Sequence, residues 1–263
     1  MKFLTNDSIA KIAPSVFAEA PASSVSSKYT FVPTTQVLDT MASAGWLPVR
    51  AQENRVRLEG KRGFQRHILR LRHRDAQDMK VGDSLPEIVL TNSHDGLAAF
   101  ELSLGLFRLV CSNGLVVANG MFESARIKHI GYRDEEVIDV VARIMSATPQ
   151  LTENVQTLQS TVLESHEQLA LAQGALSLRW EDGEAPVQAK DLLRKSRWED
   201  NAPTIWNTYN TVQENVLRGG LRGYNAAGRR TSTRAVASIT EDVRLNKALW
   251  SMAQALANHK KSA

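Results

Sequence analysis

The chain has 263 residues, of which 43% are hydrophobic and 23% are charged. These values lie close to the globular average, so wholesale disorder and collagen-like or low-complexity architectures are excluded. The single cysteine, Cys111, excludes an intramolecular disulfide framework and any multi-cysteine zinc or iron–sulfur site. No apolar run is long enough to span a membrane or to direct secretion. We therefore expect a folded cytoplasmic protein with no cofactor, no metal and no membrane association.

The charge pattern is more informative than the net charge of +4. Arginine outnumbers lysine by 21 to 11, and the planar guanidinium group is well suited to bidentate contacts with phosphate. Residues 50–80 and 190–234 are predominantly basic, whereas residues 134–184 are predominantly acidic. This asymmetry predicts an anionic partner such as nucleic acid. Charges that average out over the folded surface are the alternative explanation.

The first 28 residues differ in composition from the rest of the chain. Residues 14–28 are rich in serine and alanine and contain two prolines, which predicts a flexible N-terminal arm over residues 1–28. A helix is expected next, over residues 34–44, because apolar residues recur there at helical spacing and Gly45 can end it.

A sheet is predicted in the N-terminal half. Residues 46–58 and 64–74 alternate between apolar and polar side chains, which indicates two strands joined by a turn at residues 60–63. Three more strands are expected at residues 86–91, 97–108 and 115–118. The connections are short and turn-rich, so neighbouring strands are expected to be mostly antiparallel.

From Asp134 onward the apolar residues follow a helical period. The pattern predicts a long helix that Pro149 interrupts. The fold class expected is therefore α+β, with a mostly antiparallel curled sheet in the N-terminal half, a long helix and a helical C-terminal region. Its domains would be a sheet-rich core with the long helix over residues 29–185 and a helical region with a basic Gly/Arg loop over residues 186–263.

Two arginine-rich segments are candidates for binding phosphate. In the strand predicted at residues 64–74, a period of two places Arg66, Arg70, Arg72 and Arg74 on one side, as a possible phosphate track along an extended single strand. The alternative is an exposed sheet face whose arginines pair with acidic side chains of residues 134–184.

The second segment is the loop at residues 218–234, which combines glycines, arginines and Tyr224. Its glycines allow close backbone approach to an anion, its arginines supply charge, and Tyr224 could stack on a base. It lacks the Gly-Lys-Ser/Thr ending of a Walker loop, so nucleotide hydrolysis is not inferred. The alternative is a flexible basic loop in which Gly219 ends a helix.

The histidines and tryptophans give weaker signals. His94 and Asp95 form an isolated pair with no second spaced pair to complete a metal shell, and an Asx turn before Gly96 explains them more simply. Core filling is the expected role of most tryptophans, including Trp198, and base stacking by one of them is the alternative.

Several runs resemble a family of phage- and plasmid-borne proteins of unknown function. The runs are residues 84–96, residues 105–116 with their Arg-Leu-Val-Cys-Ser-Asn-Gly stretch, residues 126–129, and residues 210–215 with the following Arg218-Gly219-Gly220. The resemblance implies a mobile-element protein that acts in DNA processing or counters host defence. The order of elements is also similar to the core of single-strand annealing recombinases, which form rings that hold an extended strand and need no catalytic residues.

Our hypothesis is a homo-oligomeric protein that binds single-stranded DNA non-specifically and promotes annealing, and that is not an enzyme. Secondary contacts would come from Arg55, Arg57, Arg62, Arg218, Arg222, Arg229 and Arg230, in addition to the track. One alternative is an anti-defence factor that binds a host protein. Another is a metal-dependent nuclease that uses His94, Asp95 and further carboxylates.

Overall fold

The computed structural model describes residues 3–26, 29, 31–57, 59–76, 78, 84–108, 114–116, 125–127, 134–181 and 183–262. Cys111, His129 and residues 109–113 of the resembling run lie outside these described residues. The chain forms two compact units, here called the sheet unit (residues 1–148) and the helical unit (residues 149–263). The division lies between residues 148 and 149, whereas the sequence pattern suggested a boundary after residue 185.

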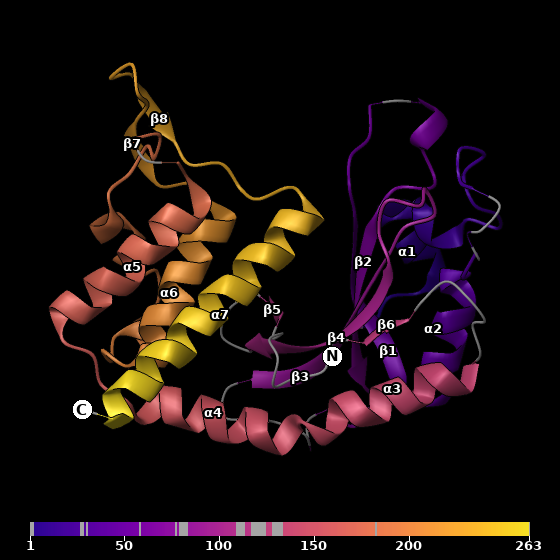
Figure 1. The fold of residues 1–263 in the computed structure, drawn as a ribbon, viewed down its shortest axis with the longest axis horizontal. Coiled ribbons are helices and arrows are strands. Elements are labelled where there is room, and N and C mark those ends of the chain that lie inside the picture. Colours follow the sequence, from indigo (N-terminus) through magenta and orange to yellow (C-terminus); the bar gives the residue numbers. More distant parts are fainter. Residues whose placement is uncertain are drawn as a thin grey trace. The chain divides into compact units, whose positions relative to one another are not determined.

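The sheet unit contains an open antiparallel sheet (Figure 1). Its strands are β1 (Trp46–Glu53), β2 (His67–His73), β3 (Ser84–Asn92), β4 (Phe100–Arg108), β5 (Gly114–Val116) and β6 (Ala125–Ile127). The first four strands pair in chain order, and the short strands β5 and β6 both pair with β4. Antiparallel pairing in chain order agrees with the short connections in the sequence.

The two faces of this sheet differ in chemistry. Leu69 and Leu71 of β2 share a face with Leu90 and Ile88 of β3, because these residues are opposite one another in the register. All four side chains are completely buried. The other face carries Arg70 opposite Val89 and Ile68 opposite Thr91, so it mixes charged, polar and apolar side chains along the same strands. The alternation of the sequence produces this division because successive side chains of a strand point to opposite faces.

Three helices belong to the sheet unit. They are α1 (Asn6–Ile12), α2 (Thr34–Ser43) and α3 (Asp134–Ser146), and the 3-10 helix η1 (Pro14–Phe17) follows α1. Helices α1 and α2 pack on β1, and α3 packs on β4.

The described part of the predicted N-terminal arm is folded onto the sheet unit. Ile9, Ala13 and Val16 are completely buried, and the Leu4 amide donates to the Pro48 carbonyl at 2.7 Å. Composition suggested flexibility because serine and alanine have little apolar surface. The buried apolar side chains of Ile9 and Val16 anchor the segment, so it is a structured part of this unit.

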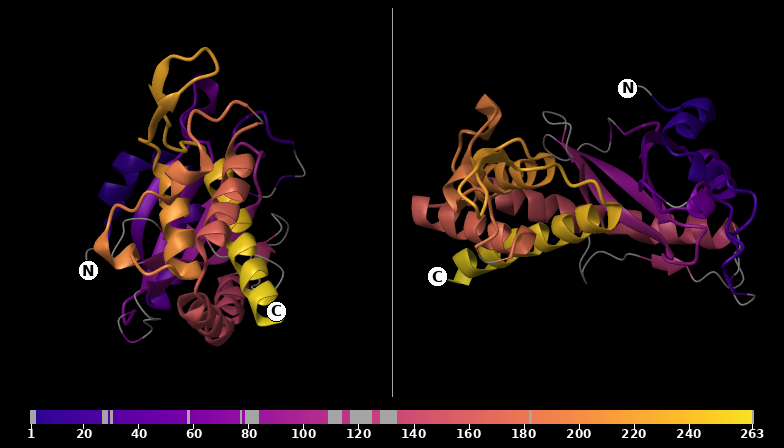
Figure 2. Two further views of the ribbon diagram at one scale, coloured as in Figure 1. Left: turned by 90° about the vertical axis from the view of Figure 1, so that its left-hand side faces the viewer. Right: turned by 90° about the horizontal axis from the view of Figure 1, so that it is seen from above.

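The helical unit is built around a central helix. Its helices are α4 (Thr148–Ser160), α5 (Ser165–Arg179), α6 (Ile205–Arg218) and α7 (Ile239–Ser262), with the 3-10 helices η3 (Ala189–Leu193) and η4 (Trp198–Asp200) between α5 and α6. Helix α6 contacts α5, α7 and η3 (Figure 2). The Thr204 hydroxyl accepts from the Asn207 amide and caps its start, and Gly219 ends it with a φ of 67°.

A small hairpin connects α6 to α7. It consists of β7 (Arg222–Tyr224) and β8 (Arg230–Ser232), which pair antiparallel. Within the helical unit it projects from the end at which α6 finishes, away from the C-terminal end of α7 (Figure 1). This hairpin is the predicted Gly/Arg loop.

The α+β prediction is confirmed, with an antiparallel sheet in the N-terminal half and helices in the C-terminal region. The predicted long helix is divided into α3, α4 and α5, and Pro149 lies in the first turn of α4, where its missing N–H leaves no helical bond unmade. None of the helices that the structure describes has the length and apolar character needed to cross a membrane.

Candidate nucleic-acid interface

The arginines of β2 do not form the exposed row that the strand pattern predicted. Arg70 and Arg72 are buried, and both donate to Glu87 of β3. The distances are 3.3 Å from Arg70 Nη1 to Glu87 Oε2 and 2.6 Å from Arg72 Nε to Glu87 Oε1. The Arg72 guanidinium also lies 3.8 Å from the centre of the Phe107 ring. Two buried cations need a counter-charge, and the strand register places Glu87 beside them.

The predicted acidic partners of these arginines are also corrected. Glu87 comes from the neighbouring strand of the same sheet and not from residues 134–184. Arg66 precedes β2 and is half-buried, whereas Arg74 follows β2, is exposed and donates to the Ala42 carbonyl at 3.3 Å. The four arginines of the predicted track therefore occupy three different environments and do not form one exposed row.

Three further predicted contacts lie in the connection between β1 and β2. Arg55, Arg57 and Arg62 are all exposed there. The connection is basic, and Glu59 of the 3-10 helix η2 (Glu59–Lys61) is its acidic residue. This segment is a basic projection of the sheet unit.

The β7–β8 hairpin combines exposed arginines with an exposed aromatic side chain. Tyr224 is opposite Arg230 in the register, and Arg222 is opposite Ser232. Directly opposed residues share a face, and so do residues two apart on a strand. Arg222, Tyr224, Arg230 and Ser232 therefore form one exposed face, on which Tyr224 retains 58% of its accessible surface. We call these four residues the hairpin face.

No acidic residue occurs between residues 215 and 240, whereas this segment contains five arginines. They are Arg218, Arg222, Arg229, Arg230 and Arg234, and all five are exposed. Arg218 forms an ion pair with Glu214. The ion pairs found among the described residues do not include Arg222, Arg229 or Arg230. The hairpin face therefore presents positive charge to solvent.

The base of the hairpin is held by backbone hydrogen bonds that only glycine geometry permits. Gly219 and Gly220 both have positive φ, and the Gly220 amide donates to the Thr233 carbonyl at 2.8 Å. A Cβ on Gly219 would lie 2.6 Å from the carbonyl carbon of Arg234. The Thr233 hydroxyl also accepts from the Leu221 amide at 3.0 Å. The two glycines of the sequence motif thus set the position of the hairpin and do not form a loose loop.

The inner face of the hairpin rests on the segment before η3. The Tyr224 amide donates to the Pro186 carbonyl at 2.8 Å, and a Cβ on Gly223 would lie 1.8 Å from that oxygen. Glycine is therefore required for the hairpin to approach residue 186. At the tip, the Asn225 side chain accepts from the amides of Ala227 and Arg229, which closes the turn.

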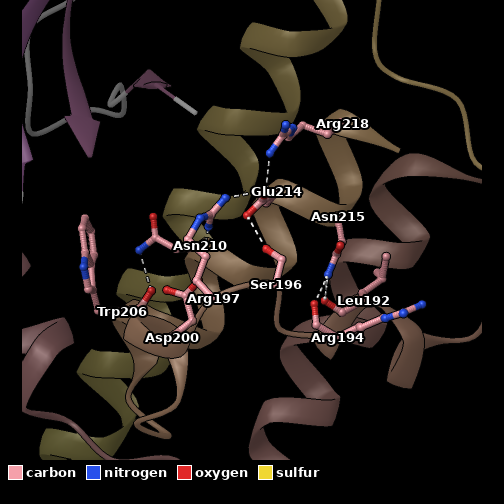
Figure 3. Close-up of polar contacts among 10 residues, drawn as sticks. All are labelled: Leu192, Arg194, Ser196, Arg197, Asp200, Trp206, Asn210, Glu214, Asn215 and Arg218. Carbon is pink, nitrogen blue, oxygen red and sulfur yellow. Dashed lines mark hydrogen bonds and ion pairs between the residues drawn. The ribbon is translucent and has the colours of Figure 1, made fainter. Parts of the chain in front are cut away.

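Below the hairpin, Glu214 of α6 joins three side chains (Figure 3). Its Oε1 accepts from Arg197 at 2.6 Å and from Arg218, and its Oε2 accepts from Ser196 at 3.3 Å. Burial acts to raise the pKa of Glu214, but the hydrogen bonds from the two arginines outweigh it and the pKa is lowered. Arg197 also pairs with Asp200 at 3.3 Å. We call Glu214, Arg197, Arg218, Ser196 and Asp200 the carboxylate cluster.

The residues of the Asn210–Asn215 motif have structural roles on α6. The Asn215 amide group donates to the carbonyls of Leu192 and Arg194, and Asn210 donates to the Trp206 carbonyl (Figure 3). Sequence reasoning missed Glu214 as the carboxylate that holds Arg218. The spacing of four residues between them is the signal that could have indicated it.

The buried histidines belong to a hydrogen-bonded network in the sheet unit. His67 Nδ1 lies 3.0 Å from Ser15 Oγ, and His67 Nε2 lies 2.9 Å from Thr34 Oγ1. Thr34 Oγ1 is also 3.3 Å from His94 Nε2. Burial and the neighbouring His94 lower the pKa of His67 to about 3. The network connects the N-terminal segment and α2 to the sheet.

The turn after β3 has the form expected from the sequence. Asp95 Oδ1 accepts from the Leu97 amide at 3.1 Å, and Gly96 has a φ of 75°. Within the described ranges, no group of three or more His, Cys, Asp and Glu side chains is arranged to hold a metal ion.

Comparison with known proteins places this chain in a family. Residues 21–250 match the model of the domain of unknown function DUF932. The chain belongs to this family. It is 41% identical to the UPF0380 protein YafZ of Escherichia coli (strain K12) and 40% identical to the UPF0380 protein YfjQ of the same strain. Each match spans 253 residues, which are 96% of this chain and 91% of the relative.

No solved structure matches the chain. The resemblance to a family of unknown function is thus confirmed, whereas the association with phages and plasmids stays a prediction. The family membership brings no activity with it, so the function has to be argued from the hairpin face and its surroundings.

Proposed function

We propose that this protein binds single-stranded DNA without sequence preference and that the hairpin face is its principal contact. The observation that carries the proposal is the exposed Tyr224 between Arg222 and Arg230, in a segment of 26 residues (215–240) without an acidic side chain. Proteins of this class combine a positive surface that follows the phosphates with aromatic side chains on which bases stack.

The geometry of the hairpin favours such a role over a solvated basic loop. A two-stranded ribbon presents its side chains on one face at regular intervals. The backbone hydrogen bonds at Gly220, Thr233 and Pro186 hold this ribbon in place within the helical unit. The ribbon is therefore already ordered, and it loses little conformational entropy when it binds a strand. Exposed Arg55, Arg57 and Arg62 would supply further phosphate contacts from the sheet unit.

In this proposal the buried arginines have a different role from the exposed ones. Arg70 and Arg72 stabilise the sheet through Glu87 and do not contact phosphate. The arginines proposed to contact phosphate are therefore the exposed ones of each unit, and the hairpin face of the helical unit is the principal contact. We also propose that the protein assembles into homo-oligomers and promotes the annealing of complementary strands.

The test is a salt series of fluorescence-anisotropy titrations with a labelled oligothymidylate. Each phosphate contact adds roughly 0.7 to the slope of log affinity against log salt for a single strand, so Arg222→Ala/Arg230→Ala should lower this slope by roughly 1.4. Tyr224→Ala should weaken binding without changing the slope, because stacking releases no counterions. Light scattering on the same samples reports assembly.

Two control variants separate charge from position. Lys261→Ala removes one exposed cation at the C-terminal end of α7, at the other end of the helical unit from the hairpin (Figure 1), and should leave the slope unchanged. Arg222→Lys/Arg230→Lys should retain it. An unchanged slope in the double alanine variant would refute the hairpin face as a phosphate contact, and absence of binding at low salt would refute the function.

A further inference from the structure

Trp198 differs from the other tryptophans of the helical unit in its exposure. It retains 81% of its accessible surface, whereas Trp206 and Trp250 are buried and Trp180 is half-buried. The expectation that Trp198 fills the core is therefore wrong. An indole in water leaves a large apolar surface hydrated, and burial of such a surface against a ligand is favourable.

Two exposed cations lie close to Trp198 in the chain. Arg194 and Lys195 are exposed a few residues before it, and Glu199 is the exposed acidic residue directly after it. Asp200 is buried and its charge is compensated by Arg197 at 3.3 Å. An aromatic ring with neighbouring cations matches the chemistry of a nucleic acid, in which bases and phosphates alternate. It matches an apolar protein surface less well.

The backbone around Trp198 is held in place. The Asn215 side chain donates to the Arg194 carbonyl at 2.9 Å, and Lys195 Nζ donates to the Asn201 carbonyl at 3.0 Å. The Asn201 amide donates to the Trp198 carbonyl at 3.0 Å. A ring on a fixed backbone loses less entropy on binding than one on a mobile loop.

The carboxylate cluster links this segment to the start of the hairpin. Arg197, which precedes Trp198, and Arg218, which precedes the hairpin, both donate to Oε1 of Glu214 (Figure 3). Their guanidinium groups therefore converge on one oxygen atom, and both segments are attached to the same stretch of α6.

We infer that Trp198 is a second base-stacking position on the same single strand that the hairpin face binds, with Arg194 and Lys195 contacting the adjoining phosphates. This inference rests on the proposed function and extends it. The strand would pass from the hairpin face over Arg218 to Trp198, with Glu214 holding the two segments in register.

The test uses the full-length chain and the intrinsic fluorescence of its tryptophans. Trp198 is exposed, whereas Trp206 and Trp250 are buried and Trp180 is half-buried. Oligothymidylate should therefore quench the emission of Trp198 and reduce the access of acrylamide to its ring, and the difference between wild type and Trp198→Phe isolates this signal from that of Trp180. Trp198→Phe should lose most of that signal while retaining binding. Trp198→Ala should weaken binding by roughly 5- to 150-fold, the range measured for loss of one stacked base.

Glu199→Gln provides the neighbouring control. It removes an exposed negative charge next to the proposed phosphate positions, so it should tighten binding by a few fold and steepen the salt dependence. Trp198→Ala should leave the thermal unfolding midpoint unchanged, because an exposed side chain contributes little to packing. This measurement separates loss of binding from loss of folding.

The outcomes distinguish this inference from the proposed function. If the wild-type chain binds no oligonucleotide, both fail. If binding depends on Arg222 and Arg230 but Trp198→Ala binds as well as wild type and the emission is unchanged, the second stacking position is refuted and the hairpin face stands. If Trp198 emission responds to protein concentration without oligonucleotide, the ring packs on a second copy and the inference is refuted.

Discussion

Removal of the Glu87 charge should destabilise the sheet unit strongly. Glu87 is completely buried and accepts from two buried cations, Arg70 and Arg72. The variant Glu87→Gln conserves size and one carbonyl acceptor but leaves both guanidinium groups without a counter-charge. It is therefore a test of charge more than of shape.

The expected magnitude follows from the geometry. Opposite unit charges ~4 Å apart attract by about 4 kcal/mol at an effective dielectric of ~20, and loss of one partner of a buried pair typically costs about 3–5 kcal/mol. We expect Glu87→Gln to lower the free energy of unfolding by about 3 kcal/mol, because Arg72 also retains its contact with Phe107. At roughly 2–4 °C per kcal/mol, the thermal midpoint should fall by about 6–12 °C.

Urea unfolding followed by far-UV circular dichroism measures this difference, and the triple variant Arg70→Met/Glu87→Leu/Arg72→Met is its control. Replacement of a complete buried ion group by apolar side chains is often neutral or stabilising by about 1–4 kcal/mol. The triple variant should therefore be at least as stable as wild type, which places it about 3 kcal/mol above Glu87→Gln. A Glu87→Gln variant within about 0.5 kcal/mol of wild type, the usual range for a surface substitution, would refute the charge argument.

Two further predictions concern the buried histidine network and the position of the hairpin. Below pH 6.5 the unfolded chain protonates His67, whereas the folded chain does so only near its pKa of about 3. The free energy of unfolding should therefore fall by about 1.4 kcal/mol per pH unit from this site as the pH falls through that window. Urea titrations at several pH values should show a smaller slope in His67→Gln than in wild type. Gly223→Ala should displace the hairpin, because its Cβ would lie 1.8 Å from the Pro186 oxygen, and hydrogen exchange at the Tyr224 amide should then accelerate. Gly60→Ala meets no atom within 4 Å and should leave exchange unchanged, and equal exchange in the two variants would contradict the proposed packing.

Much of the fold could be predicted from local pattern. The alternation along residues 67–73 identified a strand, and the helical period after Asp134 identified helices. Both follow from the geometry of the chain over a few residues, since side chains repeat every two positions in a strand and every 3.6 in a helix. Gly219 as a helix end and the turn at Asp95–Gly96 are equally local.

Which arginines face solvent was decided by the tertiary structure. The pattern on β2 assigned Arg70 and Arg72 to one face, and this was right, but the face is buried and contains Glu87. Strand register sets this pairing, and it depends on residues far apart in the chain. The N-terminal arm is a similar case, because contacts with distant residues, such as those of Ser15 with β1 and β2, show that it is folded.

The candidate site divides in the same way. Sequence alone determined that the segment around Arg218–Arg234 is basic, glycine-rich and free of acidic residues, because charge and glycine content are properties of composition. Only the folded chain could place Tyr224 opposite Arg230, bring Arg197 and Arg218 to one oxygen of Glu214, and leave Trp198 exposed. Exposure and convergence depend on what packs against each side chain, and that is settled by contacts between segments that are distant in the sequence.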